Sequence, residues 1–533
     1  MKRREFLQAS AATCVLSVAN PVSAVEKTDF ETPLPAFELD ELTISELQQA
    51  LQSGKYSSKQ LVEKYSDRIN DIDKKGPALS SVIEMNPDAE SIAAALDRER
   101  KERGSRGPLH GIPILIKDNI DTHDRMMTTA GSLALVGAKP ARDAFVAQKL
   151  REAGAVILGK TNLSEWANFR SMKSSSGWSA RGGQTKNPYS LERNPCGSSS
   201  GSGAAVAANL CAAAIGTETD GSIVCPSNAN SLVGIKPTLG LVSRSGIIPI
   251  AHSQDTAGPM TRTVSDAAIL LNAITGIDPR DESTNSGRGK SADYTTFLDK
   301  DGLRGLRLGI ARKHFGFNER VDKLMNDLLE EMKKLGAVLV DPSDIPTSGK
   351  FDESEFEVLL YEFKAGLNAY LAGLGPQAPV RSLKEIIAFN EQNREREMPY
   401  FGQDIMLKAE AKGPLTSKPY LRALRKNHLL TRTQGIDFIM KKNRLDALVA
   451  PTGGPAWPTD WINGDHFTGG YSSASAVAGY PHITVPAGYV FGLPVGISFF
   501  GGAFSEPKLI KIAYAFEQAT KSRKPPKFLE KVL

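Results

Sequence analysis

Residues 197–222 contain two glycine-flanked serine turns that decide how this chain is interpreted. The first turn, residues 197–203, reads GSSSGSG, the second, residues 216–222, reads GTETDGS, and an alanine-rich run that favours a helix separates them. Upstream, Lys117 ends the apolar run IPILIK. A serine becomes a strong nucleophile when a base takes its proton, and a lysine can be that base where burial lowers its pKa. Because glycine-rich turns also present backbone N–H groups to an oxyanion, the pattern predicts hydrolytic acyl transfer.

Several segments together resemble the amidase signature family. They read GPLHGIP at 107–113, KDN at 117–119, GSS at 197–199, GTETDGSI at 216–223 and DALVAPT at 446–452. The similarity covers nearly the whole chain after its N-terminal leader. In that family the catalytic set is a lysine and two serines 24 positions apart, which is the spacing of Ser198 and Ser222. The resemblance implies Lys117 as the general base, Ser198 as a bridging serine that follows a cis peptide bond, and Ser222 as the nucleophile.

The resemblance also implies where the substrate binds. Backbone N–H groups of Thr219, Asp220, Gly221 and Ser222 would surround the oxyanion. Most members carry DxGGSIR there, whereas this chain has ETDGSIV at 218–224, which changes the local charge. Four further stretches resemble the bacterial peptide amidase branch: WANFR at 166–170, SGWSARGGQT at 176–185, GIIPI at 246–250 and SQDTAGPM at 253–260.

This branch hydrolyses the C-terminal carboxamide of peptides to the free acid and ammonia. In that interpretation Asn168 hydrogen-bonds the terminal amide. Trp178, Trp457 and Trp461 could line the substrate groove, although ordinary core packing explains tryptophans equally well. The expected partner is therefore a peptide amide or another small-molecule amide.

Other functions stay open at this point. Residues 197–201, GSSSG, also satisfy the nucleophile elbow of α/β-hydrolases, which would make Ser199 the nucleophile. That motif needs a preceding strand, and Pro195 argues against one. Within the resemblance, the alternatives are a fatty or aryl amidase, the amidase-like component of a tRNA-dependent amidotransferase, and a non-catalytic binding protein that keeps the fold. The last is disfavoured because all three catalytic positions are occupied by the expected residues.

The N-terminus predicts export. Residues 2–7, KRREFL, form a twin-arginine pattern, and residues 9–19 form an alanine- and serine-rich stretch too short to span a membrane. Small residues before position 25 suit cleavage after Ala24. We therefore expect a signal peptide over 1–24 and a mature periplasmic or secreted protein without stable membrane association. This predicted location conflicts with the amidotransferase alternative, because that enzyme acts on tRNA in the cytoplasm.

Composition narrows the partners further. The formal net charge of the 533-residue chain is +5, and loss of three basic residues and one acidic residue with the leader lowers it to +3. Without a basic run, we expect no nucleic-acid partner and a monomer. The seven histidines show no metal-binding spacing, the cysteines form no C-x-x-C pair, and the resemblance implies no cofactor; we therefore expect neither a metal nor a cofactor. Of the cysteines beyond the leader, Cys196 and Cys225 flank the two turns, and a disulfide between them stays open.

Strand-like apolar runs alternate with helical patterns along the chain. Examples are strands over 112–116, 156–159, 306–311 and 447–450, and helices over 142–153, 321–335 and 508–520. This alternation predicts an α/β fold with a largely parallel sheet. The charged, helix-favouring stretch 351–444 predicts a helical elaboration, a lid or wall over the pocket. Length alone favours about three domains, but no linker divides the chain. The resemblance implies one domain over 25–533, a large mixed twisted sheet sandwiched between helical layers.

Overall fold

The computed structural model describes residues 36–375 and 378–532. The chain divides into two compact units, Met1–Glu38 and Leu39–Leu533, and the second holds every helix and strand discussed below. The predicted signal peptide, residues 1–24, lies outside the described residues. Among the described residues, no helix combines the length and the apolar character that crossing a bilayer needs.

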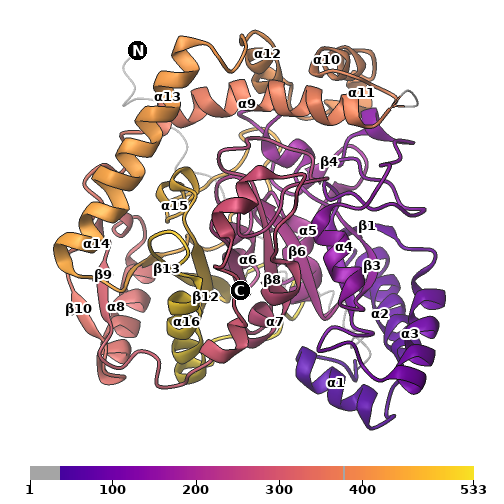
Figure 1. Ribbon diagram of the computed structural model, residues 1–533, viewed down its shortest axis with the longest axis horizontal. Helices are drawn as coiled ribbons and strands as arrows, with labels where there is room; N and C mark the ends of the chain where they lie inside the picture. Colours follow the sequence, from indigo (N-terminus) through magenta and orange to yellow (C-terminus); the bar gives the residue numbers. More distant parts are fainter. Residues whose placement is uncertain (1–35, 376–377, 533) are drawn as a thin grey trace, which may run out of the picture. The chain divides into compact units, whose positions relative to one another are not determined.

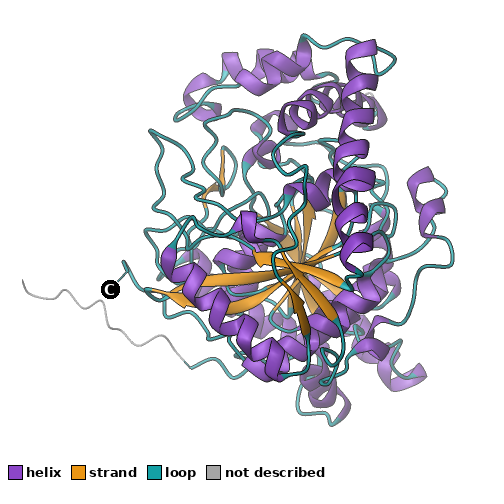
Figure 2. Ribbon diagram, turned by 90° about the vertical axis from the view of Figure 1, so that its left-hand side faces the viewer, coloured by secondary structure: helices purple, strands orange, loops and turns teal. Residues whose placement is uncertain are grey.

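A mixed sheet of eleven strands organises the second unit (Figure 2). Its order is β1-β3-β2-β6-β8-β7-β12-β13-β11-β9-β10. The strands are β1 Val82–Met85, β2 Pro113–Lys117, β3 Val156–Thr161, β6 Ala213–Glu218, β7 Val233–Lys236, β8 Thr256–Thr261, β9 Arg307–Ile310, β10 Val338–Val340, β11 Ala447–Pro451, β12 His482–Val490 and β13 Leu493–Phe500. A separate hairpin pairs β4 Trp178–Ser179 with β5 Gly183–Gln184. The predicted α/β class with a large mixed sheet is confirmed.

Sixteen α-helices accompany the strands in the described part of the chain. They are α1 Ile44–Gln52, α2 Ser58–Arg68, α3 Ala89–Arg103, α4 Phe145–Glu152, α5 Ser200–Ala207, α6 Val224–Ala229, α7 Val264–Ile274, α8 Glu319–Lys334, α9 Asp352–Gly373, α10 Leu383–Gln392, α11 Arg394–Glu397, α12 Asp404–Glu410, α13 Lys418–His428, α14 Asp437–Asn443, α15 Ser473–Ala478 and α16 Glu506–Thr520. Helices α5 and α6 pack together on β6 and β7, whereas α7 and α16 pack together on β8 and β12. Helices therefore flank the sheet, as expected.

The middle of the sheet is buried because its strands are almost wholly apolar. All residues of β2, β3 and β6 are buried, which is typical of strands covered on both faces. Strand β2 runs parallel to both β3 and β6, so the C-terminal ends of all three meet at one edge. In open α/β sheets this edge is the usual place for a ligand.

Helices α9 to α13 form a helical cap, drawn in orange tones at the top of Figure 1. Apolar residues of α9, including Phe363 and Leu367, pack on Trp166, Phe169 and Ile250, which belong to loops beyond the sheet edge. The predicted elaboration thus includes a helix whose buried face rests on loops that extend toward the two serine turns.

Candidate active site

Lys117, the last residue of β2, is fully buried and lies against the first serine turn. Its Nζ donates to Ser198 Oγ at 2.8 Å, to Thr217 Oγ1 at 2.9 Å and to the Thr217 carbonyl at 3.3 Å. Thr217 lies near the end of β6, the parallel neighbour of β2, so the strand register brings the lysine to Thr217. Asn119 Nδ2 also donates to Thr217 Oγ1, at 3.0 Å.

Burial decides the charge of this lysine. It lowers the pKa of Lys117 to about 7, and the carboxyl groups of Asp255 and Glu218 oppose the shift only in part. A large fraction of the molecules therefore carries a neutral amine near pH 7. A neutral amine can accept a proton from the adjacent hydroxyl, whereas an ammonium ion cannot.

The first serine turn has a cis peptide bond between Gly197 and Ser198. A Cβ atom at Gly197 would lie 2.2 Å from Ser164 Oγ, so no side chain fits at this position. Ser200 begins α5, and its hydroxyl donates to the Cys196 carbonyl at 2.6 Å. The backbone of this turn is therefore closely packed around the Ser198 hydroxyl that faces Lys117.

The second turn places Ser222 beside the first. The Ser199 N–H donates to the Ser222 carbonyl at 3.2 Å, and a disulfide joins Cys196 to Cys225 across the same two turns. Ser222 follows Gly221, whose φ of +78° favours glycine, and Ser222 is 8 % exposed. Lys117 and Ser198 are thus in direct contact, and Ser222, in the turn that follows β6, contacts Ser199, the residue after Ser198.

Residues 218–224 make a turn with free backbone donors. Glu218 Oε2 accepts from the N–H groups of Ile223 and Val224 at 2.8 and 3.0 Å. Within the described chain, the N–H groups of residues 219–222 have no protein acceptor. Four successive backbone donors without a protein acceptor are the kind of arrangement that can receive an anionic oxygen.

Asn168 lies at the other side of the first turn. Its Nδ2 donates to Ser176 Oγ at 3.1 Å, and a Cβ atom at Gly197 would lie 3.0 Å from that same oxygen. Asn168 Oδ1 is buried, and no hydrogen-bond donor reaches it within the described residues. The structure therefore brings Asn168 close to the first serine turn and leaves its Oδ1 as an unused hydrogen-bond acceptor.

The three tryptophans differ in their surroundings. Trp178 is buried against Phe401 with ring centroids 5.2 Å apart, which is core packing. Trp457 packs with the half-cystines of the disulfide and donates to Asp465, which also accepts from Ser176. Trp461 is 44 % exposed, stacks on Tyr400 at 4.4 Å and is the least enclosed of the three.

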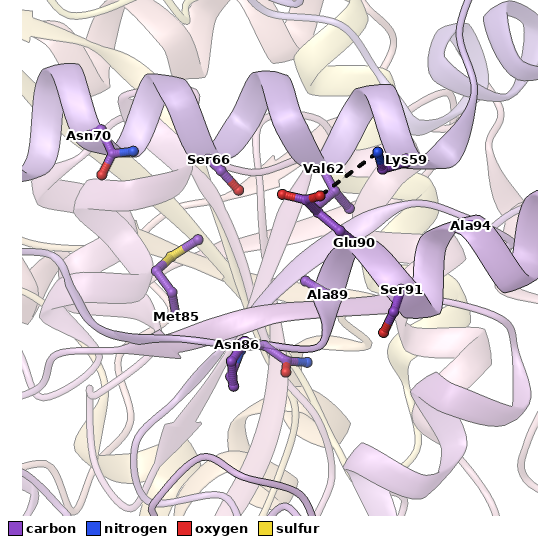
Figure 3. Close-up of a pocket in the computed structure, with 11 residues that line it drawn as sticks. Lys59, Val62, Ser66, Asn70, Met85, Asn86, Ala89, Glu90, Ser91 and Ala94 are labelled. Carbon is purple, nitrogen blue, oxygen red and sulfur yellow. Dashed lines mark ion pairs between the residues drawn. The ribbon is translucent and has the colours of Figure 1, made fainter.

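Two cavities lie away from these turns. One of about 610 Å³ is bordered by α2 and α3, where Lys59 pairs with Glu90 at 3.9 Å (Figure 3). The other, of about 490 Å³, is lined in part by Trp457, Phe491 and His466. Neither cavity includes Lys117, Ser198 or Ser222. Among the described residues, no cluster of three His, Cys, Asp or Glu side chains could hold a metal ion.

Sequence reasoning missed several residues that support the site. Asp255 accepts from the Thr219 hydroxyl at 2.6 Å, and Gln254 Nε2 donates to the Thr219 carbonyl at 3.2 Å. Both residues lie within the stretch 253–260 that resembles peptide amidases, so the polar side chains of that motif were the signal that could have identified them. Glu355, in α9, carries no such signal.

Comparison with known proteins identifies the class. Residues 60–510 match the family model for amidases, so the chain belongs to the amidase signature family. A probable amidase of Arabidopsis thaliana is 48 % identical over 503 residues, which are 92 % of this chain and 93 % of that protein. The chain is an amide hydrolase acting on C–N bonds.

Solved structures and further relatives agree with this class. The chain is 52 % identical to a peptide amidase crystallised with the competitive inhibitor chymostatin, with a TM-score of 0.90 over 92 % of this chain and all of that one. It is also 34 % identical to a glutamyl-tRNA(Gln) amidotransferase component of Thermoanaerobacter pseudethanolicus, over 92 % of this chain and 98 % of that protein.

Proposed function

We propose that this amidase hydrolyses the C-terminal carboxamide of peptides, using Lys117, Ser198 and Ser222. The observation that carries the proposal is the buried contact of 2.8 Å between Lys117 Nζ and Ser198 Oγ, beside four unpaired backbone donors at 219–222. The similarity to a peptide amidase over nearly the whole chain supports the peptide part. So does Asn168 Oδ1, a buried acceptor suited to an amide N–H group.

The reaction has two halves. Ser222 Oγ attacks the carbonyl carbon while its proton passes to Ser198, whose own proton passes to neutral Lys117. The N–H groups of residues 219–222 stabilise the oxyanion, and the C–N bond then breaks as the proton returns through Ser198 to the departing ammonia. Water attacks the acyl-enzyme by the same proton route, which releases the free acid and restores Ser222.

A substrate panel tests the peptide part. We expect ammonia release from a peptide amide, and a kcat/KM roughly 10- to 200-fold lower for the N-methylamide of the same peptide. The added methyl group would collide with the closed end of a pocket built for NH₂. Mature protein, residues 25–533, is assayed for ammonia or amine release from these two compounds, an internal peptide, a fatty acid amide and an aryl amide. A preference for fatty or aryl amides with peptide amides untouched would remove the peptide assignment and keep the amidase one.

A second candidate is favoured by one observation, the 34 % identity to an amidotransferase component. That function would require partner proteins and tRNA. We propose instead that the mature enzyme acts as a monomer on small amides without nucleic acid. A monomeric mass in solution, with ammonia release unaffected by added tRNA, is the expected result; a stable complex with other amidotransferase components would favour the second candidate.

We also propose that the protein is exported by the twin-arginine route to the periplasm or beyond. Fusing residues 1–24 to a reporter should direct it across the membrane. The variant Arg3→Lys with Arg4→Lys keeps the charge and should block export, because the route reads the arginine pair and not its charge alone. If export is unchanged in this variant, or if the native leader does not direct export, the twin-arginine route is wrong and a cytoplasmic location is favoured.

A further inference from the structure

Glu355, near the start of α9, is a buried carboxyl group directed at the turn that ends β6. Its Oε1 accepts from Gln254 Nε2 at 2.9 Å. Its carboxyl group adjoins that of Asp220, whose charge is, after burial, the main cause that raises the pKa of Glu355. The neighbouring Glu353 is exposed. A single carboxyl group therefore connects the helical cap at the top of Figure 1 with the candidate oxyanion turn.

The contacts of Glu355 reach both residues that precede Gly221. Gln254 Nε2, which donates to Glu355, also donates to the Thr219 carbonyl at 3.2 Å. The Asp220 carboxyl group itself adjoins Glu355. Thr219 is held a second time through its hydroxyl, which donates to Asp255.

The two carboxyl groups are expected to share one proton. If both were ionised, two like charges would lie in contact inside the protein. Burial, and then the neighbouring Asp220 carboxyl, raise the pKa of Glu355 well above its usual range. Burial also raises the pKa of Asp220, but hydrogen bonds from Ser472, Ser473 and Glu355 work in the opposite direction. The pair therefore holds one proton and one negative charge.

Other charged groups around the pair are few. Lys236, at the end of β7, favours the ionised form of Asp220. Asp352, in the first turn of α9, disfavours ionisation of Glu355. Glu218, which ends β6, is repelled by the charge of Asp220, which adds to the effect of burial in raising the pKa of Glu218. These surroundings are consistent with one negative charge on the pair.

We propose that Glu355 is a positioning residue for amide hydrolysis: it fixes Thr219 and Asp220, and through them the N–H groups that receive the oxyanion. The inference rests on the proposed role of residues 219–222 as the oxyanion site. A displaced turn weakens an interaction made in the transition state, so kcat should fall while KM changes little. Loss of the shared proton at high pH would have the same effect, because the two carboxylates then repel each other.

Three variants test this inference. Glu355→Ala removes the hydrogen bond from Gln254 and the contact with Asp220, and it should lower kcat by about tenfold or more with KM nearly unchanged. Glu355→Gln keeps a donor for Asp220 and an acceptor for Gln254, so it should restore most of the activity. Its amide does not ionise, so the alkaline decline of kcat in the parent enzyme should be absent from it. Glu353→Gln, on the exposed side of the same helix, is the matched control and should behave as the parent enzyme.

A second readout separates this inference from the choice of substrate. A fluorophosphonate that labels Ser222 needs the nucleophile and the oxyanion turn but no peptide recognition, so Glu355→Ala should slow labelling as it slows turnover. If the parent enzyme is labelled rapidly but does not hydrolyse peptide amides, the proposed substrate is wrong, and the proposed role of Glu355 is unaffected. Three results would each overturn that role: labelling by folded Glu355→Ala within twofold of the parent, a Glu355→Gln enzyme as slow as Glu355→Ala, or identical alkaline profiles in Glu355→Gln and the parent.

Discussion

Replacing Ser222 with alanine is expected to abolish acyl-enzyme formation and to lower kcat by on the order of a million-fold, as loss of the nucleophile does in serine hydrolases. Ser222 lies in the turn that follows β6, directly after Gly221. Its carbonyl accepts from the Ser199 N–H, and its own N–H has no protein acceptor among the residues that the structure describes. The measurement is the intact mass of enzyme quenched during turnover of a slow amide. The parent enzyme should gain the acyl group, and Ser222→Ala should not.

Ser199→Ala is the matched control because Ser199 belongs to the same pair of turns. Its hydroxyl donates to the Thr217 carbonyl at 3.0 Å and accepts from the Thr217 N–H at 3.2 Å. Removing these buried bonds should cost about 1–3 kcal/mol of stability while leaving the acyl group detectable. The opposite pattern, acylation lost in Ser199→Ala and kept in Ser222→Ala, would establish the nucleophile elbow.

The structure already disfavours that elbow on geometric grounds. An elbow places its serine between a strand and a helix. Here residues 194–199 form no strand, although α5 does begin at Ser200. Pro195 precedes the turn, as the sequence indicated, and the hydroxyl of Ser199 is already engaged by the backbone of Thr217. These contacts favour Ser222, in the second turn, over Ser199 as the proposed nucleophile.

The elements of the sheet could largely be predicted from their apolar runs. The expected strand over 112–116 is β2, that over 447–450 lies within β11, and the expected helix over 321–335 corresponds to α8 at Glu319–Lys334. Long, regular hydrophobic patterns are a strong local signal. The expectation of a largely parallel sheet was less accurate, because β8, β7, β12 and β13 are joined by antiparallel pairings. Strand pairing depends on contacts that one strand's pattern does not contain.

The site, like the sheet, could be predicted from the sequence only in part. The sequence predicted Lys117, Ser198 and Ser222 because each lies in a short motif. The family resemblance connected these motifs, which are far apart in the sequence. The Cys196–Cys225 disulfide stayed open because only the fold sets the separation of the two Cα atoms, which is 5.9 Å. Glu355 was not predictable, since a lone glutamate in a charged helix has the pattern of a solvent-exposed residue. Its burial follows from the docking of α9 on the loops around Phe169.

Lys117→Ala is expected to lower kcat/KM by roughly 10⁴-fold or more, because it removes the proposed general base. In the parent enzyme only the neutral amine accepts the proton from Ser198. Since burial lowers the pKa of Lys117 to about 7, kcat/KM should rise about tenfold per pH unit below that value and level off above it, until the alkaline decline expected from the Glu355–Asp220 pair begins. The measurement is kcat/KM for one amide between pH 5 and 9, in the parent and the variant. Any residual activity of Lys117→Ala should lack the acid limb.

Lys160→Met is the matched control for burial, because Lys160 is also a fully buried lysine and lies on β3, next to β2. Its Nζ donates to the Ile120 carbonyl at 2.6 Å and to Thr128 Oγ1 at 2.8 Å, contacts that hold a loop and involve neither serine. This variant should lower Tm and leave the acid limb near pH 7 in place. If Lys117→Ala kept near-normal turnover, or if the acid limb disappeared in Lys160→Met instead, the proton would have to leave Ser222 by a route that does not use Lys117. The contrast therefore assigns the acid limb to one of two buried lysines on adjacent strands.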